Sequence, residues 1–277
     1  RLLNLVRDTL GLVSALGHRS IAAVVGHDFG SPVAAWCSLI RPDVFRSVAL
    51  MSAPFAGPPA PESGDTVDRI HDDLAALDRP RKHYQWYYST REAAGDMRDC
   101  PQGVHAFLRA YYHYKSADWK QNQPFPLKAW VAAEMARLPA YYVMDLGKGM
   151  AQTVAPQMPS AGEIAACKWL PDDELRVYST EYERTGFQGG LQWYRCRTGR
   201  KHNAELDVYS GRAIDVPSCF IAGKSDWGAY QRPGDLEKMR DACTQLTGIH
   251  FVEGAGHWVQ QERPEEVSRL LLEFLQR

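Results

Sequence analysis

The sequence lacks an excess of charge of either sign. It has 32 Lys and Arg residues against 33 Asp and Glu residues, a net charge of -1. Nucleic acids and anionic membranes attract basic surfaces, so neither is predicted as a partner, and a small molecule is expected instead. The sequence also lacks an apolar run long enough to cross a bilayer, so no transmembrane segment is predicted.

Cysteine motifs are missing as well. The sequence has no C-x-x-C pair and no histidine at metal-ligand spacing from a cysteine, which argues against a zinc site and against a disulfide framework. No zinc site is therefore expected. We interpret the thiols as reduced and mostly buried. The six cysteines are Cys37, Cys100, Cys167, Cys196, Cys219 and Cys243.

The sequence begins at Arg1 rather than at a methionine, and its first residues already have helical periodicity up to Gly17. We therefore expect that an N-terminal part precedes them. A targeting signal would lie in that part, so a cytoplasmic location is only the default expectation.

The 277 residues, of which 45% are hydrophobic, can bury a sizeable core. Near the start, Ile21–Val25 and Val48–Met51 are short apolar runs typical of strands covered on both faces, and Val33–Ile40 between them has the composition of a helix. Strand, helix and strand in this order build parallel sheets.

The pattern changes at the prolines that follow Pro54, and about 150 residues with helical stretches and few strand-like runs come next. Alternation then resumes. It predicts strands at Val216–Ala222 and Ile249–Val252 and helices at Leu236–Leu246 and Pro264–Leu275. The predicted fold is an α/β core with a mostly parallel sheet, formed by residues 1–55 and 206–277, with an inserted helical cap at residues 56–205.

Residues 26–30, with the sequence GHDFG, lie between the first strand and the first helix of this unit. A G-x-nucleophile-x-G pentapeptide at this place is the nucleophile elbow of α/β-hydrolases, which makes Asp28 the candidate nucleophile. Gly26 and Gly30 are expected where a side chain would collide. The backbone N–H of Phe29 is expected to bind an oxyanion at the start of the helix. The alternative is that Asp28 only caps the helix.

An ester formed on an aspartate needs a base that activates water. His257 follows the strand Ile249–Val252, where this fold places its histidine. Asp226 follows the preceding strand and could orient the imidazole, and Asp215 is the alternative acid.

These residues resemble those of the epoxide hydrolases, over most of the chain. The markers are residues 26–30 (GHDFG), residues 256–258 (GHW) and residues 185–195, TGFQGGLQWYR, which match the family pattern T-G-F-x-G-x-L-x-W-Y-R. The resemblance implies an α/β-hydrolase fold and hydrolysis of an epoxide to a vicinal diol by water, with no cofactor. It also places Trp258 in the substrate pocket.

The resemblance implies two cap tyrosines that point at the epoxide oxygen. Tyr194 belongs to the T-G-F segment, and Tyr84 matches a Y-Q motif early in the cap. A phenol is protonated at neutral pH, so it can donate a hydrogen bond to the ring oxygen. Five other cap tyrosines remain alternatives: Tyr87, Tyr88, Tyr111, Tyr112 and Tyr114.

The sequence departs from the family because the H-G-x-P loop, which forms half of the oxyanion hole upstream of the elbow, is absent together with the earlier strands of the sheet. A missing oxyanion donor costs on the order of 10²–10³ in rate. We therefore expect the 277 residues to be a fragment that is inactive alone.

Three other classes of protein are alternatives to this hypothesis. Haloalkane and haloacid dehalogenases use the same aspartate and histidine, but their halide is held by an indole N–H or an arginine beside the nucleophile, where this chain has Phe29. Serine hydrolases require a G-x-S-x-G elbow, which is absent. A non-catalytic binding protein of the same fold would be expected to lose Asp28 or His257. The substrate is predicted to be hydrophobic, and its identity stays open.

Overall fold

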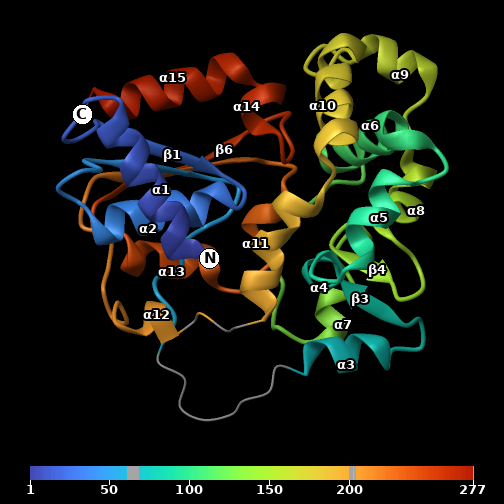
Figure 1. The fold of residues 1–277 in the computed structure, drawn as a ribbon, viewed down its shortest axis with the longest axis horizontal. Coiled ribbons are helices and arrows are strands. Elements are labelled where there is room, and N and C mark those ends of the chain that lie inside the picture. Colours follow the sequence, from blue (N-terminus) through green and yellow to red (C-terminus); the bar gives the residue numbers. More distant parts are fainter. Residues whose placement is uncertain (61–68, 200–201, 203, 277) are drawn as a thin grey trace. The chain divides into compact units, whose positions relative to one another are not determined.

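The computed structural model describes residues 1–60, 69–199, 202 and 204–276. Its chain forms two compact units (Figure 1). The first, which we call the sheet unit, comprises Arg1–Thr66, Gln123–Pro126 and Lys201–Arg277, and the second, the helical unit, comprises Val67–Asn122 and Leu127–Arg200. Within the predicted cap at 56–205, residues 61–68, 200, 201 and 203 lie outside the described part.

The sheet unit contains a four-stranded sheet whose neighbouring strands are all parallel. The strands are β1 (Val24–His27), β2 (Val48–Met51), β5 (Ser218–Gly223) and β6 (Leu246–Val252), in the order β1-β2-β5-β6. The predicted α/β fold with a mostly parallel sheet is confirmed.

The first strand was predicted at Ile21–Val25, but β1 begins three residues later and ends two residues later. Ile21 forms only an isolated bridge to Phe45, whereas His27 still pairs with Met51 of β2. The apolar segment of the sequence therefore does not coincide with the segment that pairs with β2. The backbone pairing continues through Gly26 and ends at His27, directly before Asp28.

Side chains alternate between the two faces of the sheet, as the pleat requires. Val48 and Leu50 face one hydrophobic core, and Ala49 and Met51 face the other. The helices on the first face are α1 (Leu2–Ala15), α2 (Gly30–Ile40) and α13 (Asp235–Ala242), and those on the second are α14 (Val259–Glu262) and α15 (Pro264–Leu275). Figure 1 shows α15 and α2 on opposite sides of the strands.

The bounds of helix α15 could be predicted from its sequence. Pro264 occupies its first turn together with Glu265 and Glu266, where a proline needs no hydrogen bond and acidic groups favour the helix dipole. Val267, Leu270 and Phe274 then recur at helical spacing and are buried against the sheet. The predicted bounds, Pro264–Leu275, are confirmed.

The helical unit is built mainly of helices, with one short sheet that the sequence did not predict. Its strands β3 (Arg81–His83) and β4 (Val143–Asp145) are antiparallel, with His83 opposite Val143. The helices are α3 (Ile70–Ala75), α4 (Tyr84–Tyr88), α5 (Glu92–Arg98), α6 (Gly103–Lys115), α7 (Ala132–Met135), α8 (Met150–Val154), α9 (Ala161–Ala166), α10 (Asp172–Thr185) and α11 (Gln188–Thr198), with the 3₁₀ turn η1 (Ala155–Gln157). The sheet unit also has α12 (Ala204–Asp207) and the 3₁₀ turn η2 (Trp227–Ala229).

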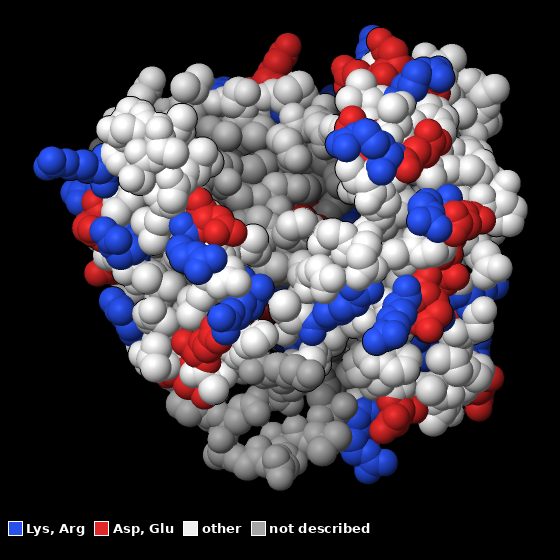
Figure 2. All heavy atoms as spheres, in the orientation of Figure 1, with Lys and Arg blue, Asp and Glu red and all other residues white. Residues whose placement is uncertain are grey.

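On the face shown in Figure 2, Lys and Arg side chains are interspersed with Asp and Glu side chains. No helix in the described part of the chain is long and apolar enough to span a membrane.

Candidate active site

Asp28 lies on a sharp turn between β1 and α2. Its φ of 53° is positive, a conformation that non-glycine residues rarely adopt. Gly26 allows this turn, because a Cβ on Gly26 would lie 2.0 Å from the carbonyl oxygen of Gly30. Strain of this kind is concentrated at functional sites, where the surrounding structure fixes it. The local geometry is that of a nucleophile elbow.

The expectation for the second glycine of the elbow was wrong. A Cβ on Gly30 would meet no described atom within 4 Å. Gly30 is the first residue of α2, which starts three residues earlier than predicted, and its side-chain position faces open space. Only Gly26 is therefore required by close packing.

Each of the four parallel strands is followed by a polar residue of the site, and these residues lie at the same edge of the sheet. Asp28 follows β1, Ser52 follows β2, Asp226 follows β5 and His257 follows β6. Because parallel strands end at the same edge, residues that are distant in sequence meet there. By contrast, the alternative acid Asp215 precedes β5 and is exposed.

His257 lies between the two carboxylates. Its Nδ1 is 3.2 Å from Asp226 Oδ1, and its Nε2 is 3.8 Å from Asp28 Oδ2. The side chains of His257 and Asp226 are 2% and 1% exposed, whereas that of Asp28 is 34% exposed. The histidine and its acid are thus withdrawn from solvent, while the candidate nucleophile is accessible.

Burial alone would raise the pKa of Asp226. The charge of His257 and hydrogen bonds from His257, Ser52 and the backbone N–H of Gly228 act in the opposite direction, and the pKa lies below its ordinary value. The Gly228 N–H lies 2.8 Å from Asp226 Oδ1. Asp226 is therefore an ionised partner for His257 at neutral pH, which favours a proton on Nδ1 and leaves Nε2 as the basic nitrogen.

Two residues outside the predicted site hold the loop of the histidine. The carboxylate of Glu262 accepts hydrogen bonds from the N–H groups of Gly256 (2.9 Å) and Trp258 (3.0 Å), on either side of His257. His27 Nε2 lies 2.6 Å from the His257 carbonyl oxygen, so this nitrogen must carry a proton. Burial lowers the pKa of His27 to about 4, so the ring is neutral at neutral pH.

The two predicted pocket residues flank this group. Phe29 directly follows Asp28 and is the N-cap of α2, and the residue is 43% exposed. Trp258 packs edge-on against His257, with ring centroids 4.7 Å apart. Both belong to the sheet unit together with Asp28.

The two predicted tyrosines come together in the helical unit. Tyr84 begins α4, Tyr194 lies in α11, and their ring centroids are 5.8 Å apart in an edge-to-face arrangement. The amide of Gln85 donates a hydrogen bond to the Tyr84 hydroxyl at 3.0 Å. Among the alternatives, Tyr88 also packs against both rings, whereas the Tyr87 hydroxyl donates to Asp96 at 3.0 Å.

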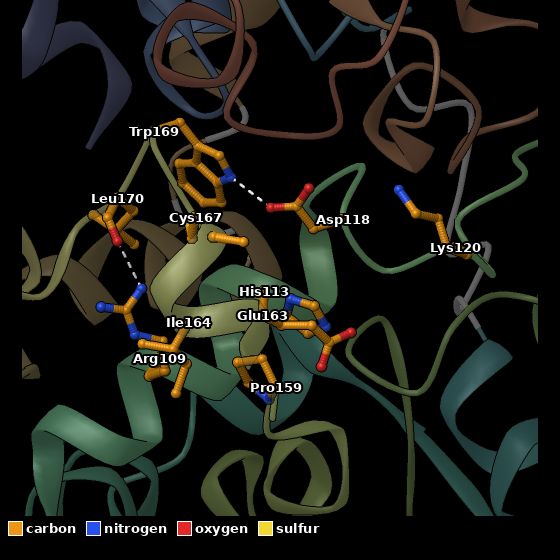
Figure 3. Close-up of a pocket in the computed structure, with 11 residues that line it drawn as sticks. Arg109, His113, Asp118, Lys120, Pro159, Glu163, Ile164, Cys167, Trp169 and Leu170 are labelled. Carbon is orange, nitrogen blue, oxygen red and sulfur yellow. Dashed lines mark hydrogen bonds between the residues drawn. The ribbon is translucent and has the colours of Figure 1, made fainter. Parts of the chain in front are cut away.

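The helical unit also has a cavity of about 160 Å³ between α6, α9 and the segments that adjoin them (Figure 3). Among its lining residues, the Trp169 indole N–H donates to Asp118 at 2.8 Å, and Arg109 donates to the Leu170 carbonyl at 2.7 Å. The predicted site residues are not among the residues described as lining it. In the described part of the chain, no cluster of three or more His, Cys, Asp or Glu side chains could hold a metal ion.

The sequence model of the α/β-hydrolase fold family matches residues 1–264. A solved epoxide hydrolase from an endophytic Streptomyces is 30% identical, with a TM-score of 0.79 over 100% of this chain and 74% of that one. Epoxide hydrolase B of Mycobacterium tuberculosis is 27% identical over 99% of this chain and 77% of that protein. The bifunctional epoxide hydrolase 2 of Mus musculus is 25% identical over 92% of this chain and 39% of that protein.

The chain therefore belongs to the α/β-hydrolase fold family and, within it, to the epoxide hydrolases. The family predicted from the sequence is confirmed.

Proposed function

We propose that this enzyme hydrolyses a hydrophobic epoxide to a vicinal diol in two steps, through an ester on Asp28. In the first step, a carboxylate oxygen of Asp28 attacks a ring carbon and the carbon–oxygen bond of the ring breaks. The alkoxide formed takes a proton from Tyr84 or Tyr194. In the second step, His257 Nε2 removes a proton from water and the hydroxide attacks the ester carbonyl carbon. The tetrahedral intermediate then breaks its bond to the diol oxygen, which takes the proton of the new carboxyl group, so that Asp28 returns as a carboxylate. The proton held by His257 restores the tyrosine hydroxyl through solvent.

The observation that carries this proposal is the geometry around Asp28. The carboxylate is accessible on a strained turn, and the basic nitrogen of His257 lies 3.8 Å away while Asp226 holds the other nitrogen. During ester hydrolysis negative charge develops on the carbonyl oxygen. The Phe29 N–H at the start of α2 is the proposed donor to that oxygen, where the helix dipole also favours negative charge.

Isotope labelling of a single turnover distinguishes this mechanism from direct attack of water on the epoxide. The full-length protein, in excess over styrene oxide, reacts in water enriched in oxygen-18. The two-step mechanism predicts an unlabelled diol in the first turnover and the label in the peptide that contains Asp28. A labelled diol in the first turnover would contradict the ester intermediate, and halide release from a haloalkane without diol formation would indicate a dehalogenase.

The roles of the two tyrosines are tested by removing their hydroxyls. We expect Tyr84→Phe and Tyr194→Phe each to slow formation of the ester by about 10-fold to 100-fold, because a positioned acid protonates the leaving oxygen. Rapid-quench mass spectrometry measures this step. Tyr87→Phe is the matched control in α4, since its hydroxyl already donates to Asp96. If Tyr87→Phe alone slowed ester formation, the role would pass to Tyr87.

A further inference from the structure

Ser52 is the fourth polar residue at the site and has no place in the mechanism above. It directly follows β2, is completely buried, and its φ of 68° is positive. Among the described residues, Asp28 is the one other non-glycine residue with a positive φ. The backbone N–H of Ser52 donates to Ile221 in β5 at 3.0 Å, so the neighbouring strand fixes this conformation.

The Ser52 side chain is directed at the contact between the histidine and its acid. Its Oγ lies 3.1 Å from His257 Nδ1, as close as Asp226 Oδ1 at 3.2 Å. A side chain at position 228 would collide with this group, because a Cβ on Gly228 would lie 2.5 Å from Ser52 Oγ and 3.0 Å from both carboxylate oxygens of Asp226. Gly228 therefore leaves the space that the Ser52 hydroxyl and the Asp226 carboxylate occupy.

We propose that Ser52 is a positioning residue for the histidine base. With its proton on Nδ1, His257 donates to both Ser52 Oγ and Asp226 Oδ1, and the Ser52 hydroxyl donates its own proton to the Asp226 carboxylate. The three groups then form a closed set of hydrogen bonds that holds the imidazole in the tautomer with a basic Nε2. This inference rests on the proposed function, because it assigns Ser52 to the step in which His257 activates water.

The electrostatics of the acid agree with this arrangement. The hydroxyl of Ser52 is one of the groups that lower the pKa of Asp226 against the effect of burial. A hydroxyl suits this place because it accepts one hydrogen bond and donates another. An apolar side chain at this position would leave His257 and Asp226 with one hydrogen-bonding partner fewer.

The test separates ester formation from ester hydrolysis. We expect Ser52→Ala in the full-length protein to form the ester with styrene oxide at the wild-type rate, since Asp28 performs that step. We expect hydrolysis of the ester to slow by about tenfold or more, the effect of losing a hydrogen bond to a charged group. Rapid-quench mass spectrometry measures both rates. Ser52→Gly accommodates the positive φ and serves as the second variant should Ser52→Ala fail to fold.

Ser179→Ala is the matched control. Ser179 is also buried, and its Oγ also lies 3.1 Å from a histidine nitrogen, His105 Nδ1, but in the helical unit. It should leave both rates unchanged. Ester hydrolysis at the wild-type rate in the Ser52 variants, or equal slowing of both steps, would overturn the proposal. A wild-type protein that forms no ester would instead refute the proposed function, and this inference with it.

Discussion

Asn in place of Asp28 should reduce diol formation by on the order of 10⁶-fold, the loss seen when the nucleophile or the base is removed from a serine hydrolase. A neutral amide cannot open an epoxide ring as a carboxylate does. The fold should persist, because Asn is among the residues that tolerate a positive φ such as the 53° observed here. Steady-state hydrolysis of styrene oxide by the full-length protein measures the loss.

The control for this variant is Asp43→Asn, which neutralises an acid of the same unit that is exposed and pairs with Arg41 at 2.6 Å. It should hydrolyse styrene oxide at the wild-type rate, and both variants should show thermal unfolding like that of the wild type. Diol formation by Asp28→Asn at the rate of this control would rule out Asp28 as the nucleophile.

The second large effect concerns the histidine and has a different kinetic signature. We expect His257→Gln to form the ester and then stop, so that one substrate adduct accumulates on each chain while turnover falls by about 10⁴-fold or more. Without a base at 3.8 Å from Asp28, water is not activated, but the attack of the carboxylate on the ring needs no base. Mass spectrometry of the intact protein and of the peptide containing Asp28 detects the adduct.

His18→Gln is the corresponding control, because His18 is an exposed histidine of the sheet unit. It should turn over without accumulating an adduct. If His257→Gln failed to form an adduct although it remained folded, His257 would be needed in the first step, and the assignment of the base to the second step would be wrong.

The parts of the fold that the sequence predicted well are those in which composition and tertiary contacts agree. Strand β2, Val48–Met51, is apolar on both sides because both faces of the sheet are covered, and its bounds match the prediction. Strands β3 and β4 were missed for the opposite reason. Arg81–His83 is a polar segment of three residues, and its pairing with Val143–Asp145 is specified by contacts across 60 residues of chain.

The residues of the candidate site likewise fall into those that the sequence could predict and those that it could not. Asp28, Asp226 and His257 could be proposed because each stands in a local sequence context that a known motif or strand end explains. Ser52 and Glu262 could not, because a lone serine after a strand and a glutamate in a short helix have no signature of their own. The signal available for Ser52 was its place directly after an apolar strand, at the same sheet edge as the nucleophile.

The Glu262 and His27 contacts have an energetic consequence for turnover. One carboxylate fixes the N–H groups before and after His257, and His27 fixes its carbonyl oxygen, so the backbone of the base is anchored at three points. In the proposed mechanism, the entropy of orienting the base is lost when the chain folds, and the loop needs no reorganisation when water is activated. Under that proposal, His257 is preorganised by hydrogen bonds within the sheet unit from residues that are not assigned to contact the substrate.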